Sequence, residues 1–420
     1  MNLTMPSATS GTPRRGPLAG FRVLEMGSTV AGPFCGRLLA DFGAEVIKVE
    51  PAEGDPVRTM GKRFHGKSLY AASIFRNKDL VAIDLRQPQG QRIAADLAAK
   101  CDVVVENFRP GGLEKWGLGY ADLSVRNPGL VMVRISGFGQ DGPYSQRAGY
   151  GVIGEAVSGL RHLTGDPDRA PSRVAVSMTD YITGLYAAFG VSMALLARQR
   201  TGRGQYIDAA LYECAFSFME PWIPAHEKLG HVPTRAGSRL PESTPNNLYP
   251  TGDHSYIHIA AMGDAVFRRL VAAMGQPEFG DDPRFHDAVS RSEHHEEIDE
   301  LIGQWTSERT LTQLEATLSR ENVPATRIFT IADIFGDPHY KARHTIVEAP
   351  DDDLGSVAMA AVVPRLSDTP GAVLHSGRRV GQDTRRVLDQ LLGLSSEQID
   401  ALAAAGVVTC DANRATGDRS

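Results

Sequence analysis

The stretch FRVLEMGSTVAGPFCGRLLADFGAEVIKVE, residues 21–50, contains a complete strand–helix–strand pattern. Residues 23–26 form a short apolar run, a turn over residues 27–32 follows, and Pro33 suits the first position of a helix. Apolar residues then recur on one helix face, and Gly43 is predicted to end this helix. The run VIKV at residues 46–49 indicates a second buried strand. Because strands connected through a helix are parallel, this stretch predicts an α/β fold.

The same alternation continues along the first half of the chain. Apolar runs predict strands at residues 80–85, 102–106 and 130–135, and an amphipathic helix is expected at 89–99. A further strand, or the start of a helix, is expected at 205–211. Repeated alternation of this kind is typical of a doubly wound, Rossmann-like parallel sheet, so we predict that fold for the large domain.

The length of 420 residues exceeds the size at which one hydrophobic core usually stops growing, so we expect two domains. Residues 1–16 are predicted to be a disordered tail. The large domain is predicted to comprise residues 17–219 and 346–420, and a smaller α+β domain with its linkers residues 220–345. The proline-rich residues 221–250 have few periodic apolar positions, as expected of a long crossing loop or linker.

Shorter patterns predict the elements of the second half. Residues 253–261 alternate like a half-buried strand, and helical periodicity follows at 264–275, 294–304 and 310–320. The last predicted elements, which we expect to return to the large domain, are a strand pair at 355–366 and a helix pair at 381–405.

Composition and charge exclude several classes of protein. The formal net charge is -6 and no run of basic residues occurs, so no nucleic-acid partner is expected. The four cysteines, Cys35, Cys101, Cys214 and Cys410, lack CxxC spacing and predict neither a zinc site nor a disulfide framework. No apolar run approaches the ~18 residues of a membrane span, and the N-terminus lacks the apolar core of a signal peptide. We therefore expect a cytoplasmic protein with no membrane segment.

GFGQDG at residues 137–142 matches the GxGxxG pattern and follows a predicted strand. Pro143 comes at once, no periodic helix begins there, and no acidic residue ends a strand about 20 residues later, which disfavours a nicotinamide site. A glycine-rich turn that lets the backbone approach another ligand fits better. The run HHEE at residues 294–297 predicts a solvated helix face, because adjacent helical residues point about 100° apart and do not share a metal.

Residues 106–118, ENFRPGGLEKWGL, follow a predicted strand and should lie at the carboxyl end of the parallel sheet, where ligands bind. The Asn, Arg and Lys side chains and the glycine backbone suit contact with phosphate or a nucleotide. An ordinary surface loop with basic tips is the alternative.

Residues 178–208, MTDYITGLYAAFGVSMALLARQRTGRGQYID, predict a long helix that begins near Asp180 and ends at Gly202. As an N-cap, Asp180 would accept backbone hydrogen bonds. As a reagent, it would be a carboxylate kept ionised by the helix dipole and able to attack an activated acyl group. Spacing alone does not choose between these roles.

Taken in order, these motifs resemble the class III CoA-transferases of the CaiB/BaiF type, which include formyl-CoA transferase. The resemblance extends from about Leu18 to Val408 and rests on residues 23–58, 77–90, 102–118, 135–144, 178–213 and 380–408. It implies a ring-shaped monomer and two such rings interlocked as a homodimer. It also implies coenzyme A as a co-substrate, and no metal is expected.

Carried over residue by residue, the resemblance implies that Asp180 is the covalent nucleophile. The residues expected to line CoA are Val30, Ala31, Asp84, Leu85, Arg86, Asn107, Phe108 and Lys115. Gly137, Gly139 and Gln140 are expected to stabilise the oxyanion of each tetrahedral species. The implied reaction moves CoA from a donor acyl-CoA, with succinyl-CoA as a candidate, to an organic acid through an aspartyl anhydride and an aspartyl-CoA thioester.

Two alternatives belong to other classes of protein. The α-methylacyl-CoA racemases of the same superfamily use a His–Asp pair in an AGHD-like segment, and this chain has AGYG at residues 148–151. A phenol, with an ordinary pKa of about 10, is a poor substitute for that base. A non-catalytic CoA-binding protein is the second alternative, and the presence of Asp180 speaks against it.

The substrate acid is not defined by the motifs. Arg235 and Arg239 are hypothesised to pair with the second carboxylate of a dicarboxylic substrate such as succinate. Solvated loop arginines are the alternative, since such side chains are commonly exposed.

Overall fold

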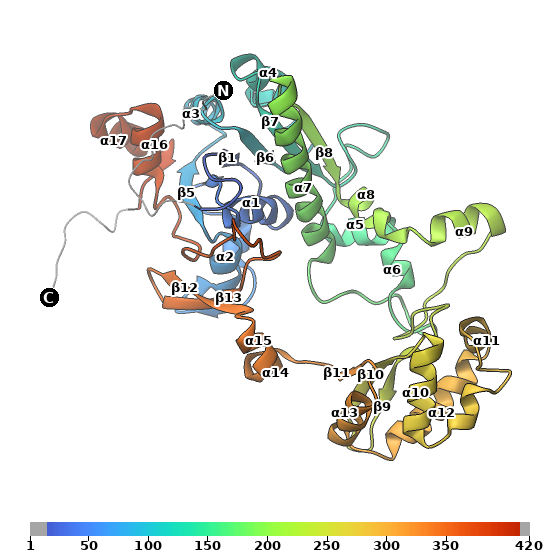
Figure 1. Cartoon of the computed structure of the whole chain (residues 1–420). Helices are drawn as coiled ribbons and strands as arrows, with labels where there is room; N and C mark the ends of the chain where they lie inside the picture. The colour runs from blue at the N-terminus through green and yellow to red at the C-terminus, as the bar shows by residue number, and fades with distance from the viewer. Residues whose placement is uncertain (1–14, 412–420) are drawn as a thin grey trace. The chain divides into compact units, whose positions relative to one another are not determined.

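The computed structural model describes residues 15–411 (Figure 1), so all but the last two positions of the predicted N-terminal tail lie outside the described residues. The chain divides into two compact units. The first contains the described residues up to Leu160, together with Ala175–Pro224 and those from Arg343 onward. The second contains Arg161–Val174 and Ala225–Ala342.

A seven-stranded sheet forms the centre of the first unit. Its strands, in spatial order, are β14 (Val408–Thr409), β5 (Lys78–Ile83), β2 (Glu45–Glu50), β1 (Arg22–Glu25), β6 (Val103–Glu106), β7 (Val131–Ser136) and β8 (Tyr206–Ala210). Every neighbouring pair is parallel except β14 with β5. The six parallel strands follow the order 3-2-1-4-5-6 of doubly wound sheets, so the predicted parallel α/β architecture is confirmed.

Helices cover both faces of this sheet (Figure 1). Successive strand residues point to opposite faces, so Val23 packs toward one helical layer and Leu24 toward the other. The first layer contains α1 (Ala31–Asp41) and α7 (Met178–Thr201). The second contains α3 (Pro88–Ala98), α4 (Tyr120–Arg126), α16 (Thr384–Leu392) and α17 (Ser396–Ala404). The predicted C-terminal helix pair is thereby confirmed.

Helices α1 and α7 make a close contact at Gly184. A Cβ atom at this position would lie 2.8 Å from the Ala31 carbonyl oxygen and 2.9 Å from Phe34 Cδ1. Both helices follow parallel strands and therefore begin at the carboxyl edge of the sheet. The contact fixes the first turn of α7, which carries Asp180, beside the first turn of α1.

Among residues 15–411, α7 alone is long and apolar enough to cross a membrane by length and composition, and 39% of its most apolar window is buried. The sequence expectation that no apolar segment reaches this length is corrected here, since small residues such as Gly184 and Ala188 raise the apolar content of the helix. A core helix of a soluble protein passes the same test, so this is weak evidence for a membrane segment.

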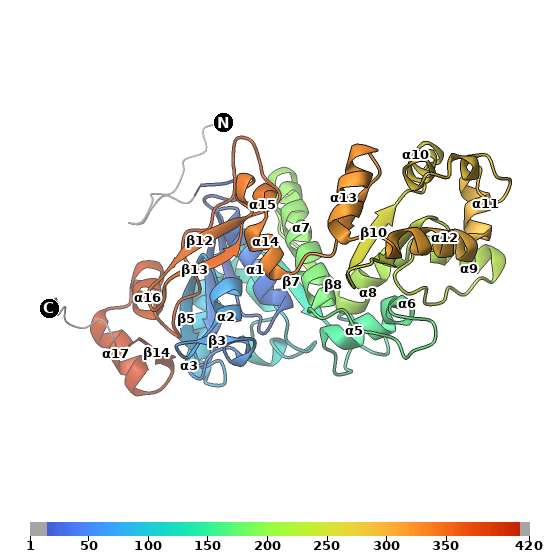
Figure 2. The same ribbon diagram turned by 90° about the horizontal axis from the view of Figure 1, so that it is seen from below.

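Smaller elements lie around the sheet of the first unit. They are α2 (Leu69–Ile74), α5 (Gly151–Val157), α8 (Leu211–Phe216), the hairpin β3 (Arg63–Phe64) with β4 (Lys67–Ser68), and the hairpin β12 (Ile346–Asp351) with β13 (Gly355–Ala360). Figure 2 shows β12 and β13 side by side. The predicted strand pair within residues 355–366 is wrong, because β13 pairs with the preceding β12 and Pro364, which lacks an N–H donor, follows.

The second unit contains a three-stranded sheet of order β11 (Ala325–Arg327), β10 (Tyr256–Ala260) and β9 (Asn246–Pro250). Helices pack on it, chiefly α10 (Asp264–Met274), α12 (His295–Ser307) and α13 (Leu311–Arg320), and these three were predicted. Further helices of this unit include α6 (Leu160–Leu163), α11 (Ala288–Glu293), α14 (Ile331–Gly336) and α15 (Pro338–Ala342).

The prediction of a loop over residues 221–250 is wrong in part. The region contains α9 (Trp222–Leu229) and strand β9. Strand β9 has the polar sequence NNLYP, and it is a strand because it pairs with β10 over its whole length. Tertiary pairing therefore overrides a weak local pattern.

Buried charges support the turn between β1 and α1. Lys48 on β2 donates to the Gly27 carbonyl and, at 2.8 Å, to Asp55. Asp55 accepts the N–H of Thr29 at 3.0 Å, and Thr29 has the left-handed φ of 68°. Burial would raise the pKa of Asp55, but Lys48 and these N–H bonds hold it below its usual value. The ionised Asp55 thus fixes a backbone conformation that residues other than glycine seldom adopt.

Replacing Lys48 by Met should destabilise the protein by about 3–5 kcal/mol, because it leaves the buried carboxylate of Asp55 without its cation. The free energy of unfolding in urea is the measurement. Lys100→Met, at an exposed lysine, is the control and should change it by less than about 0.5 kcal/mol. Equal stabilities of the two variants would contradict the assigned role of Lys48.

Candidate active site

Asp180 is the third residue of α7 and is half-buried, while Ser177 occupies the N-cap position. Asp180 is therefore not the cap itself, which separates the two roles that the sequence left open. Its carboxylate lies against Gly151, the first residue of α5. The positive end of the α7 dipole favours a negative charge at this position.

Gly151 leaves the space that the Asp180 carboxylate occupies. A Cβ atom added to Gly151 would overlap Oδ2 of Asp180. The segment before it is equally close to the glycine-rich turn, since a Cβ atom at Gly137 would lie 3.0 Å from the Gly149 Cα atom. Residues 149–151 thus join Asp180 to the turn at 137–140, and sequence reasoning gave Gly151 no role.

Two tyrosines contact each other beside Asp180. The hydroxyl groups of Tyr70 on α2 and Tyr181 on α7 are 2.8 Å apart. Burial, the Tyr181 hydroxyl and the negative charge of Asp180 all raise the pKa of Tyr70. Tyr181 packs edge-on against Phe34 of α1 with ring centroids 4.7 Å apart. The wall beside the carboxylate is therefore aromatic, and the Tyr70 hydroxyl in it is neutral.

The backbone of the predicted oxyanion turn is largely engaged within the protein. The N–H of Gly139 donates to the Ser136 hydroxyl at 2.9 Å, and the N–H of Gln140 donates to Asp208 on β8 at 2.8 Å. These two N–H groups hold the turn in place and do not face a ligand in this conformation. Of the three predicted oxyanion donors, the backbone N–H of Gly137 stays a prediction.

The residues predicted to line CoA on the β1–α1 turn are buried. Val30 and Ala31 are 2% and 3% exposed. Asn107 follows β6 and holds this turn, since its amide oxygen accepts the Ser28 N–H at 2.7 Å and its amide nitrogen donates to the Ser28 carbonyl at 2.8 Å. The side chain of Asn107 thus ties the two loops at the point where the strand order reverses.

Other predicted CoA contacts lie at the carboxyl ends of β5 and β6. Asp84 accepts from Arg86 at 2.7 Å, and Leu85 between them packs toward the core. Phe108 packs edge-on against Trp116 with ring centroids 5.6 Å apart.

The two predicted cationic contacts, Arg86 and Lys115, are exposed and can reach phosphates. Glu106 lies at the end of β6, beside the loop that carries Lys115, and burial raises the pKa of Glu106 to about 7. Glu106 also pairs with Arg134 at 3.1 Å.

The two arginines predicted for the substrate lie in the second unit. The Arg235 guanidinium donates to the carbonyls of His162, Asp166 and Pro167 and thereby ties residues 161–174 to the unit. Arg239 is half-buried in the same segment. These bonds use three of the five N–H donors of Arg235, and the substrate role of both arginines stays a prediction.

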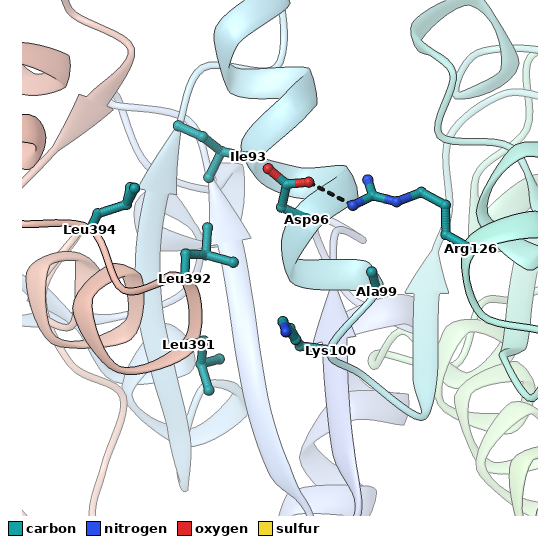
Figure 3. A pocket seen from close by; sticks show the side chains of 8 residues that line it. All are labelled: Ile93, Asp96, Ala99, Lys100, Arg126, Leu391, Leu392 and Leu394. Carbon is teal, nitrogen blue, oxygen red and sulfur yellow. Dashed lines mark hydrogen bonds and ion pairs between the residues drawn. The ribbon is translucent and has the colours of Figure 1, made fainter.

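A surface cavity of about 360 Å³ lies elsewhere in the first unit, between the end of α3 and the end of α16 (Figure 3). Its lining is Ile93, Asp96, Ala99, Lys100, Arg126, Leu391, Leu392 and Leu394, and Asp96 pairs with Arg126 at 2.7 Å. Helix α3 begins at the carboxyl edge of the sheet and ends at the amino edge, so this cavity is remote from Asp180.

No group of three or more side chains suited to hold a metal occurs within residues 15–411.

Fold and site together define an α/β enzyme that presents a carboxylate at the carboxyl edge of its sheet. Residues 18–384 match the CoA-transferase family III. The chain is 48% identical over 394 residues to the succinyl-CoA–D-citramalate CoA-transferase of Chloroflexus aurantiacus, covering 93% of this chain and 98% of that one. It is 41% identical to the succinyl-CoA–L-malate CoA-transferase beta subunit of the same organism, covering 95% and 100%.

A solved structure agrees with these sequence relationships. The crystal structure of a CaiB/BaiF family protein from Brucella suis matches with a TM-score of 0.80 at 34% identity, covering 90% of this chain and 100% of that one. The chain therefore belongs to CoA-transferase family III. The predicted family and the predicted enzyme class, a CoA-transferase, are confirmed.

Replacing Gly151 by Ala should lower kcat about 100-fold, because the added methyl group displaces the Asp180 carboxylate by about 1 Å or more. Steady-state kinetics with succinyl-CoA and a dicarboxylic acceptor measure the effect, and thermal unfolding reports the fold. Gly303→Ala is the matched control, since a Cβ atom there meets nothing within 4 Å. Unchanged kcat in Gly151→Ala would show that the carboxylate does not need this space.

Proposed function

We propose that the protein transfers CoA from succinyl-CoA to a second dicarboxylic acid, with Asp180 as the covalent nucleophile. The observation that carries the proposal is the Asp180 carboxylate held against Gly151 at the carboxyl edge of the sheet in a chain of this family. The named relatives that act on citramalate and malate support short dicarboxylates as acceptors. CoA enters as a co-substrate, and no step needs a metal.

In the proposed reaction, an oxygen of Asp180 attacks the thioester carbonyl of succinyl-CoA. The C–S bond breaks, CoA leaves as a thiolate, and a succinyl-aspartyl anhydride forms. The thiolate then attacks the aspartyl carbonyl, which releases succinate and leaves an aspartyl-CoA thioester. The acceptor carboxylate repeats these two steps in the opposite direction and departs as its CoA thioester, so Asp180 is regenerated without net proton transfer.

CoA is proposed to bind over the β1–α1 turn and the loop after β6. Val30, Ala31 and Phe108 would line it, and Arg86 and Lys115 would face its phosphates. Asn107 contributes by holding the turn, because the oxygen and the nitrogen of its carboxamide are both hydrogen-bonded to the backbone of Ser28.

The racemase alternative requires a base that removes an α-proton. The residue at the relevant position is Tyr150, whose side chain is 72% exposed, and it is followed by Gly151. An exposed phenol is poorly suited to abstract a proton from carbon at neutral pH. The geometry therefore favours transfer over racemisation.

The exposed face of α7 supports the predicted homodimer as a further part of the proposal. Leu185, Phe189 and Leu196 are 58%, 60% and 53% exposed and lie on one side of this helix. Met193 and Tyr186 extend the same apolar surface. An apolar surface of this length on a soluble enzyme is typical of a subunit interface, and we propose a second copy of the chain as its partner. The cytoplasmic location stays a prediction.

Replacing Asp180 by Ala should lower kcat by about 10⁴-fold or more, as expected when a covalent nucleophile is removed. Wild type incubated with succinyl-CoA and then hydroxylamine should yield a hydroxamate on the peptide that contains Asp180, and the variant should yield none. Asp168→Ala, at an exposed aspartate of the second unit, is the control. Deuterium entering the α-position of a 2-methylacyl-CoA without any acceptor acid would instead support the racemase.

Replacing Phe189 by Asp should weaken the proposed dimer by about 100-fold or more in Kd, because a charge enters an apolar interface. Light scattering after gel filtration should give a wild-type mass of twice 45.3 kDa and a lower mass for the variant. Val125→Asp changes an isolated exposed apolar residue of α4 and should leave the mass unchanged. A monomeric wild type at micromolar concentration would refute the proposed dimer.

A further inference from the structure

The side chain of Gln140 makes no hydrogen bond within the described residues, whereas the backbone around it is hydrogen-bonded. Its amide oxygen and amide nitrogen are both buried and have no hydrogen-bond partner among residues 15–411. The backbone of the same residue is fixed, since its N–H donates to Asp208 at 2.8 Å, and the neighbouring Gly139 N–H donates to Ser136 at 2.9 Å. The carboxamide is therefore held on a rigid turn with both of its polar groups unused.

The turn that carries Gln140 belongs to the edge of the sheet where Asp180 lies. Gly137 of this turn packs on Gly149, two residues before the glycine that contacts the Asp180 carboxylate. On the other side of the turn, a Cβ atom added to Gly139 would lie 3.6 Å from Oδ2 of Asp208. The unused carboxamide is thus carried by a turn that packs on the segment contacting the Asp180 carboxylate.

A buried carboxamide without partners is unfavourable, because its donor and its acceptor have both lost water. Such a group is retained where a ligand satisfies it. A carboxamide offers an acceptor oxygen and a donor nitrogen side by side. The matching ligand therefore carries a donor and an acceptor side by side as well.

Building on the proposed function, we propose that Gln140 determines specificity for 2-hydroxy dicarboxylates. In a 2-hydroxy acid, the hydroxyl group and the carboxylate are on adjacent carbons. The hydroxyl donates to Oε1 of Gln140, and a carboxylate oxygen accepts from Nε2. The same dicarboxylate without its hydroxyl offers only acceptors and leaves Oε1 unpaired, which a buried polar site rejects strongly.

The amide groups of the pantetheine arm of CoA fit this site less well. A secondary amide is trans, so its N–H and C=O groups point in opposite directions. One such amide does not bond to both polar atoms of a single carboxamide. The geometry thus favours the acceptor acid over CoA as the partner of Gln140.

The assignment also orients the acceptor. If Gln140 binds the hydroxyl and its neighbouring carboxylate, the carboxylate remote from the hydroxyl is the one that reaches Asp180. The CoA thioester of the product should then be on the remote carboxylate.

The experiment compares two acceptors that differ only in the hydroxyl group, citramalate and 2-methylsuccinate, with succinyl-CoA as the donor. Wild type should prefer citramalate in kcat/KM by about 10-fold or more. Gln140→Met, of similar shape but with no polar atoms, should reduce that ratio at least about 10-fold toward 1, with the KM for succinyl-CoA changed less than about twofold. Gln140→Glu keeps an acceptor for the hydroxyl and should retain a preference for citramalate.

Gln146→Met, at an exposed glutamine of the following loop, is the control and should keep the wild-type ratio. An unchanged ratio in a Gln140→Met variant that still transfers CoA would overturn the proposal while leaving the transferase function intact. An equal loss with both acceptors, together with a raised KM for succinyl-CoA, would also overturn it and would assign Gln140 to CoA. Absence of transfer to any acceptor by wild type would refute the proposed function instead.

If Gln140→Met does not fold, as judged by thermal unfolding, Gln140→Glu decides the question. A preference for citramalate that survives in this variant supports the role of the acceptor oxygen. A preference that disappears overturns the proposal.

Discussion

The contact between α1 and α7 at Gly184 is the constraint on which the site depends. With hydrogen alone as its side chain, Gly184 lets α7 approach to within contact of the Ala31 carbonyl. Because both helices begin at the same edge of the sheet, this approach places Asp180 beside the β1–α1 turn. A side chain at Gly184 would force the helices apart and move the carboxylate away from that turn. The position of Asp180 is therefore set by packing between helices, one helical turn away from this carboxylate.

The turn itself is fixed by electrostatics and hydrogen bonding. Asp55, paired with Lys48, accepts the Thr29 N–H of the turn, and Asn107 ties the turn to the loop after β6. Lys48 and Asp55 are buried, Asn107 is half-buried, and each finds a partner, so these groups give the backbone one defined conformation. A rigid surface of this kind suits a long ligand such as CoA, since little order remains to be imposed when the ligand binds.

Much of the fold is readable from the sequence, because β1, α1 and β2 each carry a local pattern strong enough to define them. Strand β9 was missed since its polar residues become a strand only through β10, and the partner of β13 was missed since β12 precedes the predicted pair. Asp180 was predicted from the order of motifs, and its role as nucleophile stays a prediction. Gly151 and Tyr70 were not singled out, because they approach Asp180 through contacts between segments that local periodicity does not reveal.

The proposed chemistry explains why the neighbour of Asp180 is a glycine. Transfer of CoA between carboxylates exchanges acyl groups and thiolates, and no proton leaves carbon, so a dedicated base has no task. What the reaction needs is room on both faces of one carboxylate, since the thiolate attacks the aspartyl carbonyl after the acyl group has been attached. Gly151 leaves the space in which that carboxylate lies, and the Tyr70 hydroxyl, whose pKa is raised, adds no second charge. A side chain at residue 151 would supply chemistry that transfer does not use and would remove the space that it does.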